Sequence, residues 1–130
     1  MHHFHAVVWI DHREARVFEF SADDVQKSVI HPHAPKHQVH HKAGSLGAGH
    51  AKEDQAFYHA VAEALAHTGE ILIVGPGQAK TMLLKHLHAH DPKVAEKVVA
   101  IETVDHPSDG QVVAHARKYF DAADRMTPQR

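Results

Sequence analysis

The stretch EILIVGPG, from Glu70 to Gly77, decides the fold class of this chain. Its first part is a nearly continuous apolar run, which is typical of a strand buried on both faces of a parallel sheet, and the glycine–proline–glycine turn ends it. Helical hydrophobic periodicity runs from Ala51 to Thr68 before this strand and from Ala79 to His90 after it. A strand between two amphipathic helices predicts an α/β domain.

The same alternation of helix and strand continues toward the C-terminus. Asp91-Pro92 is expected to end the second helix, because the residue before a proline disfavours helical backbone. A second buried strand is predicted at Val98 to Val104, and Ser108 is a good N-cap for a last helix from Asp109 to about Asp124. Right-handed crossovers would make the strands of this half parallel.

The N-terminal part reads as three short antiparallel strands. Phe4 to Ile10 is apolar and β-branched, Glu14 to Phe20 alternates, and the polar break between them predicts a β-hairpin. Val25 to His31 alternates more weakly and predicts a third strand. The predicted fold is therefore a mixed sheet with the order β-β-β-α-β-α-β-α, the order of a ribonuclease H-like α/β domain. A ferredoxin-like or flavodoxin-like variant remains open.

Length and composition predict one domain. The chain has 130 residues and 14.4 kDa, and we expect a domain over residues 1–126 with a frayed tail at 127–130. Residues 32–50 lack a hydrophobic period and are rich in histidine and glycine, so a long loop is predicted there. The absence of cysteine excludes a disulfide scaffold and thiolate zinc sites. No apolar run approaches the roughly 18 residues of a membrane span, and Met1 to Ile10 lacks a signal-peptide pattern, so we expect a cytoplasmic protein with no membrane partner.

Histidine is the abnormal component. Its 17 copies exceed the 14 lysines and arginines and the 16 aspartates and glutamates. The formal charge of −2 assumes neutral histidines, and charging half of them near pH 6.5 would make it about +6.5. A loop dense in histidine and lysine can then pair with phosphates. The predicted RNA-binding residues in and beside the loop are Lys36, His37, His40, His41, Lys42 and Lys52.

The turn after the central strand is a second candidate for anion contact. Gly75 and Gly77 would let the backbone approach a ligand, and Lys80 falls in the first turn of a helix, where anions are favoured. The spacing matches neither a Walker A loop nor a dinucleotide-binding glycine pattern. A plain tight turn with a surface lysine is the alternative interpretation.

The sequence leaves two other functions open. One is a metal-binding protein for zinc or nickel, although nothing in the sequence requires a cofactor. His86 and His90 share a helix face at i, i+4, a spacing that suits either metal. Together with two histidines at the start of the loop, the candidate metal ligands are His31, His33, His86 and His90. A magnesium-dependent hydrolase of the ribonuclease H-like type would need clustered carboxylates, for which the candidates are Asp11, Glu102 and Asp105. These acids equally suit turns and helix caps.

Three segments carry a resemblance to a known family. The first, Ala6 to Val17, has an acid at the turn and Glu-Ala at the start of the second strand. The second, Ile71 to Lys80, holds an apolar strand, a GPG turn and the start of a helix with a lysine. The third, Thr103 to Gly110, leads from a strand into the last helix. These segments resemble the central domain of the eukaryotic and archaeal peptide chain release factor and Pelota family, in the single-domain bacterial form often called a translational machinery protein. The resemblance implies a ribonuclease H-like fold without the nuclease acids.

The resemblance also bears on activity and partners. The family's release factors carry Gly-Gly-Gln in the loop before the first long helix, whereas the corresponding loop here reads GSLGAGH from Gly44 to His50. Peptidyl-tRNA hydrolysis is therefore not expected, and a non-enzymatic domain associated with the ribosome, tRNA or rRNA is the leading hypothesis. Phe18 and Phe20 look exposed on the hairpin, which favours a homo-oligomer.

Overall fold

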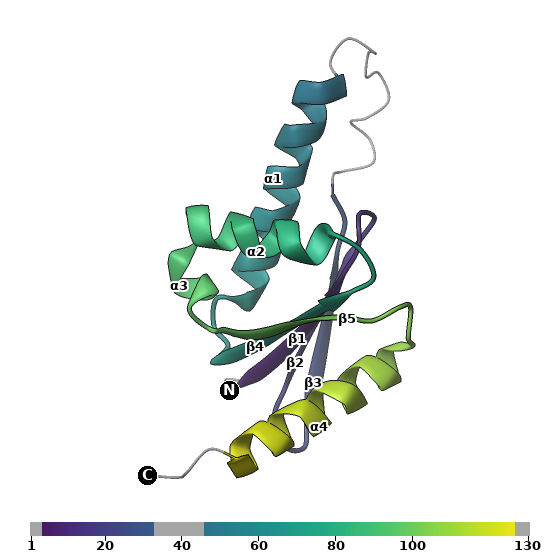
Figure 1. The fold of residues 1–130 in the computed structure, drawn as a ribbon, viewed down its shortest axis with the longest axis vertical. Helices are drawn as coiled ribbons and strands as arrows, with labels where there is room; N and C mark the ends of the chain where they lie inside the picture. The colour runs from purple at the N-terminus through teal and green to yellow at the C-terminus, as the bar shows by residue number, and fades with distance from the viewer. Residues whose placement is uncertain (1–3, 33–45, 127–130) are drawn as a thin grey trace.

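The computed structural model describes residues 4–32 and 46–126, and its elements follow the predicted order with one short helix added (Figure 1). In chain order they are β1 (His5–Ile10), β2 (Ala15–Phe20), β3 (Val25–Ile30), α1 (Leu46–Leu65), β4 (Glu70–Gly75), α2 (Ala79–His90), α3 (Pro92–Ala95), β5 (Val98–Thr103) and α4 (Asp109–Met126). The predicted tail at 127–130 and most of the predicted loop lie outside the described residues.

The five strands form one mixed sheet in the order β3-β2-β1-β4-β5. β1 pairs with β2 and β2 with β3 in antiparallel fashion, whereas β4 pairs in parallel with both β1 and β5. This mixture confirms the predicted α/β class. It excludes the ferredoxin-like variant, which would be antiparallel throughout, and the flavodoxin-like variant, which would be parallel throughout.

Helices cover both faces of the sheet, with α1, α2 and α3 on one side and α4 on the other (Figure 1). Alternate side chains of the central strands divide between the two layers. Val8 and Ile73 join the core under α1 and α2, while Val7 and Leu72 join the core under α4. Burial on both faces explains why β1 and β4 are continuous apolar runs in the sequence.

Three features of the elements differ from the prediction. Among the described strands β5 lies at the edge of the sheet beside β4 and is not a fully buried strand; Val99 in it is 43% exposed. Pro92 does not simply end α2, since its fixed φ suits the first turn of the short α3. α1 begins at Leu46 rather than Ala51, so Gly47 and Gly49, which the sequence assigns to the loop, lie in its first turns.

The predicted exposure of Phe18 and Phe20 is wrong. Both are buried, at 2% and 3% exposure, because α4 lies across this face of β2 and adds Val112 and Phe120 to the same cluster. They therefore give no support to self-association. In the described part of the chain, none of the helices has the length and apolar character of a membrane span.

Candidate functional site

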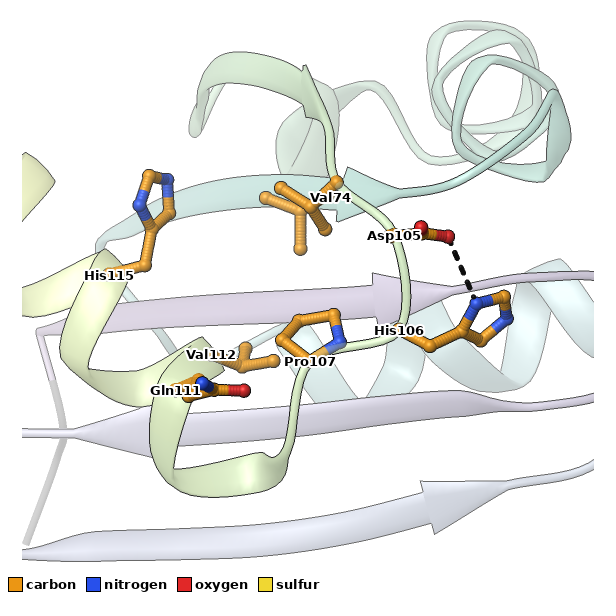
Figure 2. Close-up of a pocket in the computed structure, with 8 residues that line it drawn as sticks. Val74, Asp105, His106, Pro107, Gln111, Val112 and His115 are labelled. Atoms are coloured by element: carbon orange, nitrogen blue, oxygen red, sulfur yellow. Dashed lines mark hydrogen bonds and ion pairs between the residues drawn. The ribbon is translucent and has the colours of Figure 1, made fainter.

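The carboxyl ends of β4 and β5 and the start of α4 line an open cavity of about 540 Å³ (Figure 2). Open α/β sheets characteristically bind ligands at this edge, where the strand ends and the following turns leave a crevice. The wall is apolar in the middle and polar at its ends. Its lining residues are Val74, Val104, Asp105, His106, Pro107, Gln111, Val112 and His115.

Trp9 holds the segment that follows β5. Its indole is 1% exposed in the middle of the sheet, and Nε1 donates a hydrogen bond to the backbone oxygen of Asp105 at 2.9 Å. The His106 ring lies 5.3 Å from the indole, and the Arg16 guanidinium lies 4.4 Å from it as a cation–π contact. The wall of the cavity formed by Asp105 and His106 is thereby attached to the central strand β1.

The first turn of α4 is fixed by two sets of polar contacts. Ser108 Oγ accepts a hydrogen bond from the Gln111 backbone N–H at 3.2 Å, and Gln111 Oε1 accepts one from the Ser108 backbone N–H at 2.9 Å. This reciprocal capping box confirms Ser108 as the N-cap. Asp109 accepts hydrogen bonds from Arg16 on β2 and Lys27 on β3. The Lys27 ammonium, together with Arg16, holds the pKa of the Asp109 carboxyl below its usual range despite the opposing effect of burial.

Two histidines beside carboxylates stand at opposite ends of the cavity, as Figure 2 shows for His106 and His115. His106 Nδ1 lies 3.2 Å from Asp105 Oδ1, and His115 Nε2 lies 2.6 Å from Glu102 Oε1. Both imidazoles are about half exposed or more, so each presents a polar ring edge to solvent. The arrangement suits hydrogen bonding and ion pairing to a polar ligand that spans the cavity.

The three candidate nuclease acids do not meet at one metal position within the described residues. Asp11 Oδ1 accepts hydrogen bonds from the backbone N–H groups of Arg13 and Glu14 at 2.8 and 3.0 Å, as the turn residue of the hairpin. Asp105 is 93% exposed, and Glu102 is paired with His115. The geometry is that of turn and surface acids rather than of a two-metal site.

The predicted turn residues Gly75, Gly77 and Lys80 lie at the same carboxyl edge of the sheet, but in different environments. A Cβ on Gly75 would lie 2.3 Å from the backbone oxygen of Ile10, so close strand packing requires glycine there. A Cβ on Gly77 would meet no atom of the described residues within 4 Å, so their packing does not require glycine at that position. Lys80 is largely buried, and its ammonium donates a hydrogen bond to the Gly77 backbone oxygen.

The other predicted site residues are scattered. Lys36, His37, His40, His41, Lys42 and His33 lie outside the described residues, and Lys52 falls within α1. His31 is exposed just after β3, with Nδ1 3.5 Å from the Arg13 backbone oxygen. His86 is buried in α2, and its ring centroid lies 4.8 Å from that of the exposed His90.

Of the residues that line the cavity, sequence reasoning singled out only Asp105, as a candidate nuclease acid, and missed the others. Trp9 is the one signal that was available, because a buried tryptophan needs a partner for its N–H and therefore predicts a fixed loop nearby. His106 and His115 carried no local pattern, since histidine is frequent along the whole chain.

The fold is shared with known translation factors. No protein-family model matches the chain, and no curated protein sequence matches it significantly. Among solved structures, it is similar to Thermoplasma acidophilum Pelota, with a TM-score of 0.61 and 18% identity over 95% of this chain and 34% of that one. An archaeal translation termination factor, aRF1, matches with a TM-score of 0.58 and 12% identity over 94% of this chain and 38% of that one. Dom34 of S. cerevisiae matches with a TM-score of 0.53 and 12% identity over 88% of this chain and 32% of that one. Dom34 is described as a translation termination-like factor involved in RNA quality control pathways and interacting with Hbs1.

The chain thus spans about a third of the length of each of these proteins. The predicted similarity to the central domain of the release factor and Pelota family is confirmed as a likeness of fold.

Proposed function

We propose that the chain is a translation-factor-like domain that associates with the ribosome or with its RNA in the cytoplasm and acts by binding rather than catalysis. The observation that carries this proposal is the fold, which it shares with Pelota, aRF1 and Dom34 across nearly its whole length. The segment from Gly44 to His50, which reads GSLGAGH and runs into the start of α1, lacks the Gly-Gly-Gln of the family's release factors. Occupation of a ribosomal site therefore fits this chain better than peptidyl-tRNA hydrolysis.

The RNA-contacting surface that we propose has two parts. One is the histidine- and lysine-rich segment from Lys36 to Lys42 with Lys52 in α1, whose cationic groups would pair with phosphates. The other is the turn after β4, where Gly77 is exposed; a phosphate there would meet the turn's backbone, while the largely buried Lys80 ammonium holds the turn through the Gly77 backbone oxygen and adds positive charge beneath it.

The charge balance predicts how this binding depends on solution conditions. With neutral histidines the formal charge is −2, so nonspecific attraction to RNA is weak. Acidification from about pH 7.5 to about pH 6 charges histidines and should strengthen binding. Raising salt from about 50 to about 200 mM should weaken it, since phosphate contacts release counterions.

Co-sedimentation with purified ribosomes tests the proposal directly. The full chain is expected to pellet with ribosomes at low salt, and the variant Lys36→Glu/Lys42→Glu/Lys52→Glu to lose at least about tenfold in affinity. The loss of three phosphate contacts should reduce the slope of log affinity against log salt by about 2 to 3.

A matched control carries the same change of charge elsewhere. Lys85, Lys93 and Lys118 are exposed on α2, α3 and α4, and their replacement by glutamate should change the affinity much less. An equal loss in both triple variants would show a general charge effect and contradict the proposed surface. Absence of the wild-type chain from the ribosome pellet under all these conditions would contradict the proposed function itself.

A further inference from the structure

Three side chains, from α1, α2 and the α2–α3 junction, meet on the side of the sheet opposite α4. They are His59 on α1, His86 on α2 and Asp91 between α2 and α3. One ligand atom from each lies within 4.8 Å of the other two, and no other group of this kind occurs among the described residues. Of the four histidines that the sequence singles out as metal ligands, only His86 belongs to this group.

The centre of the group is polar and buried without hydrogen bonds. His86 Nε2 and Asp91 Oδ2 are 3.3 Å apart, and neither atom is exposed or has a hydrogen-bond partner in the described structure. The His86 side chain as a whole is 4% exposed. A buried polar pair of this kind is costly unless a proton or a cation lies between the two atoms.

The other ring nitrogen of His86 indicates whether a proton or a cation lies between Nε2 and Asp91 Oδ2. Nδ1 lies 2.7 Å from Gln55 Oε1, which can only accept, so Nδ1 carries the proton. A neutral imidazole carries one N–H, and this hydrogen bond assigns it to Nδ1. Nε2 therefore presents a lone pair toward the Asp91 carboxylate, which is the form that a metal ion requires.

His59 is arranged in a similar way. Its Nδ1 faces Asp91 Oδ2 at 3.7 Å, and its Nε2 lies 3.2 Å from Glu63 Oε2. A carboxylate that accepts the proton of the far ring nitrogen orients a histidine ligand and fixes its tautomer. Both histidines thus have a polar partner on the side away from Asp91.

We propose that His59, His86 and Asp91 bind one divalent first-row metal ion. The chemistry of these ligands favours zinc. Imidazole nitrogens with one carboxylate suit zinc rather than magnesium or calcium. Tetrahedral zinc with bonds of about 2.1 Å separates its ligand atoms by about 3.4 Å. The His86–Asp91 separation of 3.3 Å already fits, and His59, with a side chain 55% exposed, needs only a small movement to complete the set.

Such an ion would join α1 to the α2–α3 junction. Three protein ligands leave a fourth position on zinc for water or a further ligand, and the exposed side of the group lies at His59. This inference rests on the side chains of one helical layer and is independent of the proposed RNA binding.

The thermal unfolding of the full chain, measured with and without zinc, tests this site against the many other histidines. At free zinc about 100-fold above the dissociation constant, we expect the wild-type Tm to rise on the order of 10 °C. His59→Gln, at an exposed position, and the isosteric Asp91→Asn should each weaken zinc binding at least about 100-fold and abolish this rise. Gln55→Ala, which removes only the partner of Nδ1, should weaken it about 10- to 100-fold.

His88→Gln is the matched control, because His88 is exposed on α2 and does not belong to the group. It should keep the full rise in Tm. Anomalous diffraction from crystals grown with one equivalent of zinc should place the ion between His59, His86 and Asp91. A rise in Tm that survives both His59→Gln and Asp91→Asn, no rise in the wild type, or zinc density at other histidines alone would each overturn the proposal.

Discussion

Trp9 Nε1 and the backbone oxygen of Asp105 are joined by a 2.9 Å hydrogen bond that links the central strand β1 to the segment leading into α4. The two residues are 96 positions apart in the sequence. Because the indole is buried, this bond satisfies its N–H and at the same time holds Asp105, His106 and Pro107 as one wall of the cavity.

The first prediction concerns this link. Trp9→Phe removes the donor and reduces the buried volume, so we expect a loss of about 2–4 kcal/mol in the free energy of unfolding. Urea denaturation followed by circular dichroism measures it. His106→Ala removes a ring from the same wall but leaves the hydrogen bond, and should cost less. A cost for Trp9→Phe no larger than that for His106→Ala would show that the bond does not hold the segment.

The second prediction separates the two glycines of the GPG turn. Gly75→Ala places a Cβ 2.3 Å from the Ile10 backbone oxygen in β1, which cannot move without disturbing the central strands, so we expect a loss of at least about 1–3 kcal/mol. Gly77→Ala meets no atom within 4 Å and no positive φ, so its stability should be unchanged or higher by up to about 1 kcal/mol. Parallel denaturant titrations compare the two variants, and similar destabilisation by both would contradict the packing argument.

The third prediction is a pH dependence at the start of α4. The Lys27 hydrogen bond, with Arg16, lowers the pKa of Asp109 in the folded state, so the unfolded chain takes up its proton first as pH falls. The stabilisation is complete above the unfolded-state pKa of about 3.9 and is lost as pH falls through the lower folded value. Asp109→Asn should therefore be less stable near pH 7 and lose less stability between about pH 5 and pH 2.

Thermal unfolding across this pH range measures the effect. Asp121→Asn is the control, since Asp121 is an exposed carboxylate on the same helix and outside the Arg16–Lys27 contacts. Parallel pH profiles for the wild type and Asp109→Asn would rule out the assigned role of this carboxyl.

The fourth prediction concerns the capping box of α4. Ser108→Ala and Gln111→Ala should each cost about 1 kcal/mol, because each removes a partner of one otherwise unpaired backbone N–H. Since the two side chains act on one helix terminus, the double variant is expected to lose less than the sum of the single losses. A double-mutant cycle from chemical denaturation gives the coupling, and strictly additive losses would argue against a shared cap.

The order of elements was accessible from the sequence because it depends on local chemistry. The alternation in β2, the apolar runs of β1 and β4 and the cap at Ser108 each lie within a few neighbouring residues. The segments that resemble the release factor and Pelota central domain predicted the same fold, and the likeness to solved structures of that family confirms this fold.

The errors have a common physical origin in contacts between distant segments. Phe18 and Phe20 alternate with buried neighbours and looked exposed, but α4 from the end of the chain covers them. The apolar run at β5 looked like a central strand, yet the sheet order leaves it with one neighbour. A local sequence pattern predicts neither the path of α4 nor the order of the strands in the sheet.

The sequence by itself determined the α/β class, the succession of strands and helices and the excess of histidine. Only the tertiary structure decided which histidines matter. His106 and His115 line one cavity because the sheet edge and α4 bring them there, and His59 and His86 come together because α1 and α2 pack side by side next to Asp91. A histidine becomes a specific site only where folding surrounds it with oriented partners and excludes water, and such partners come from segments far apart along the chain.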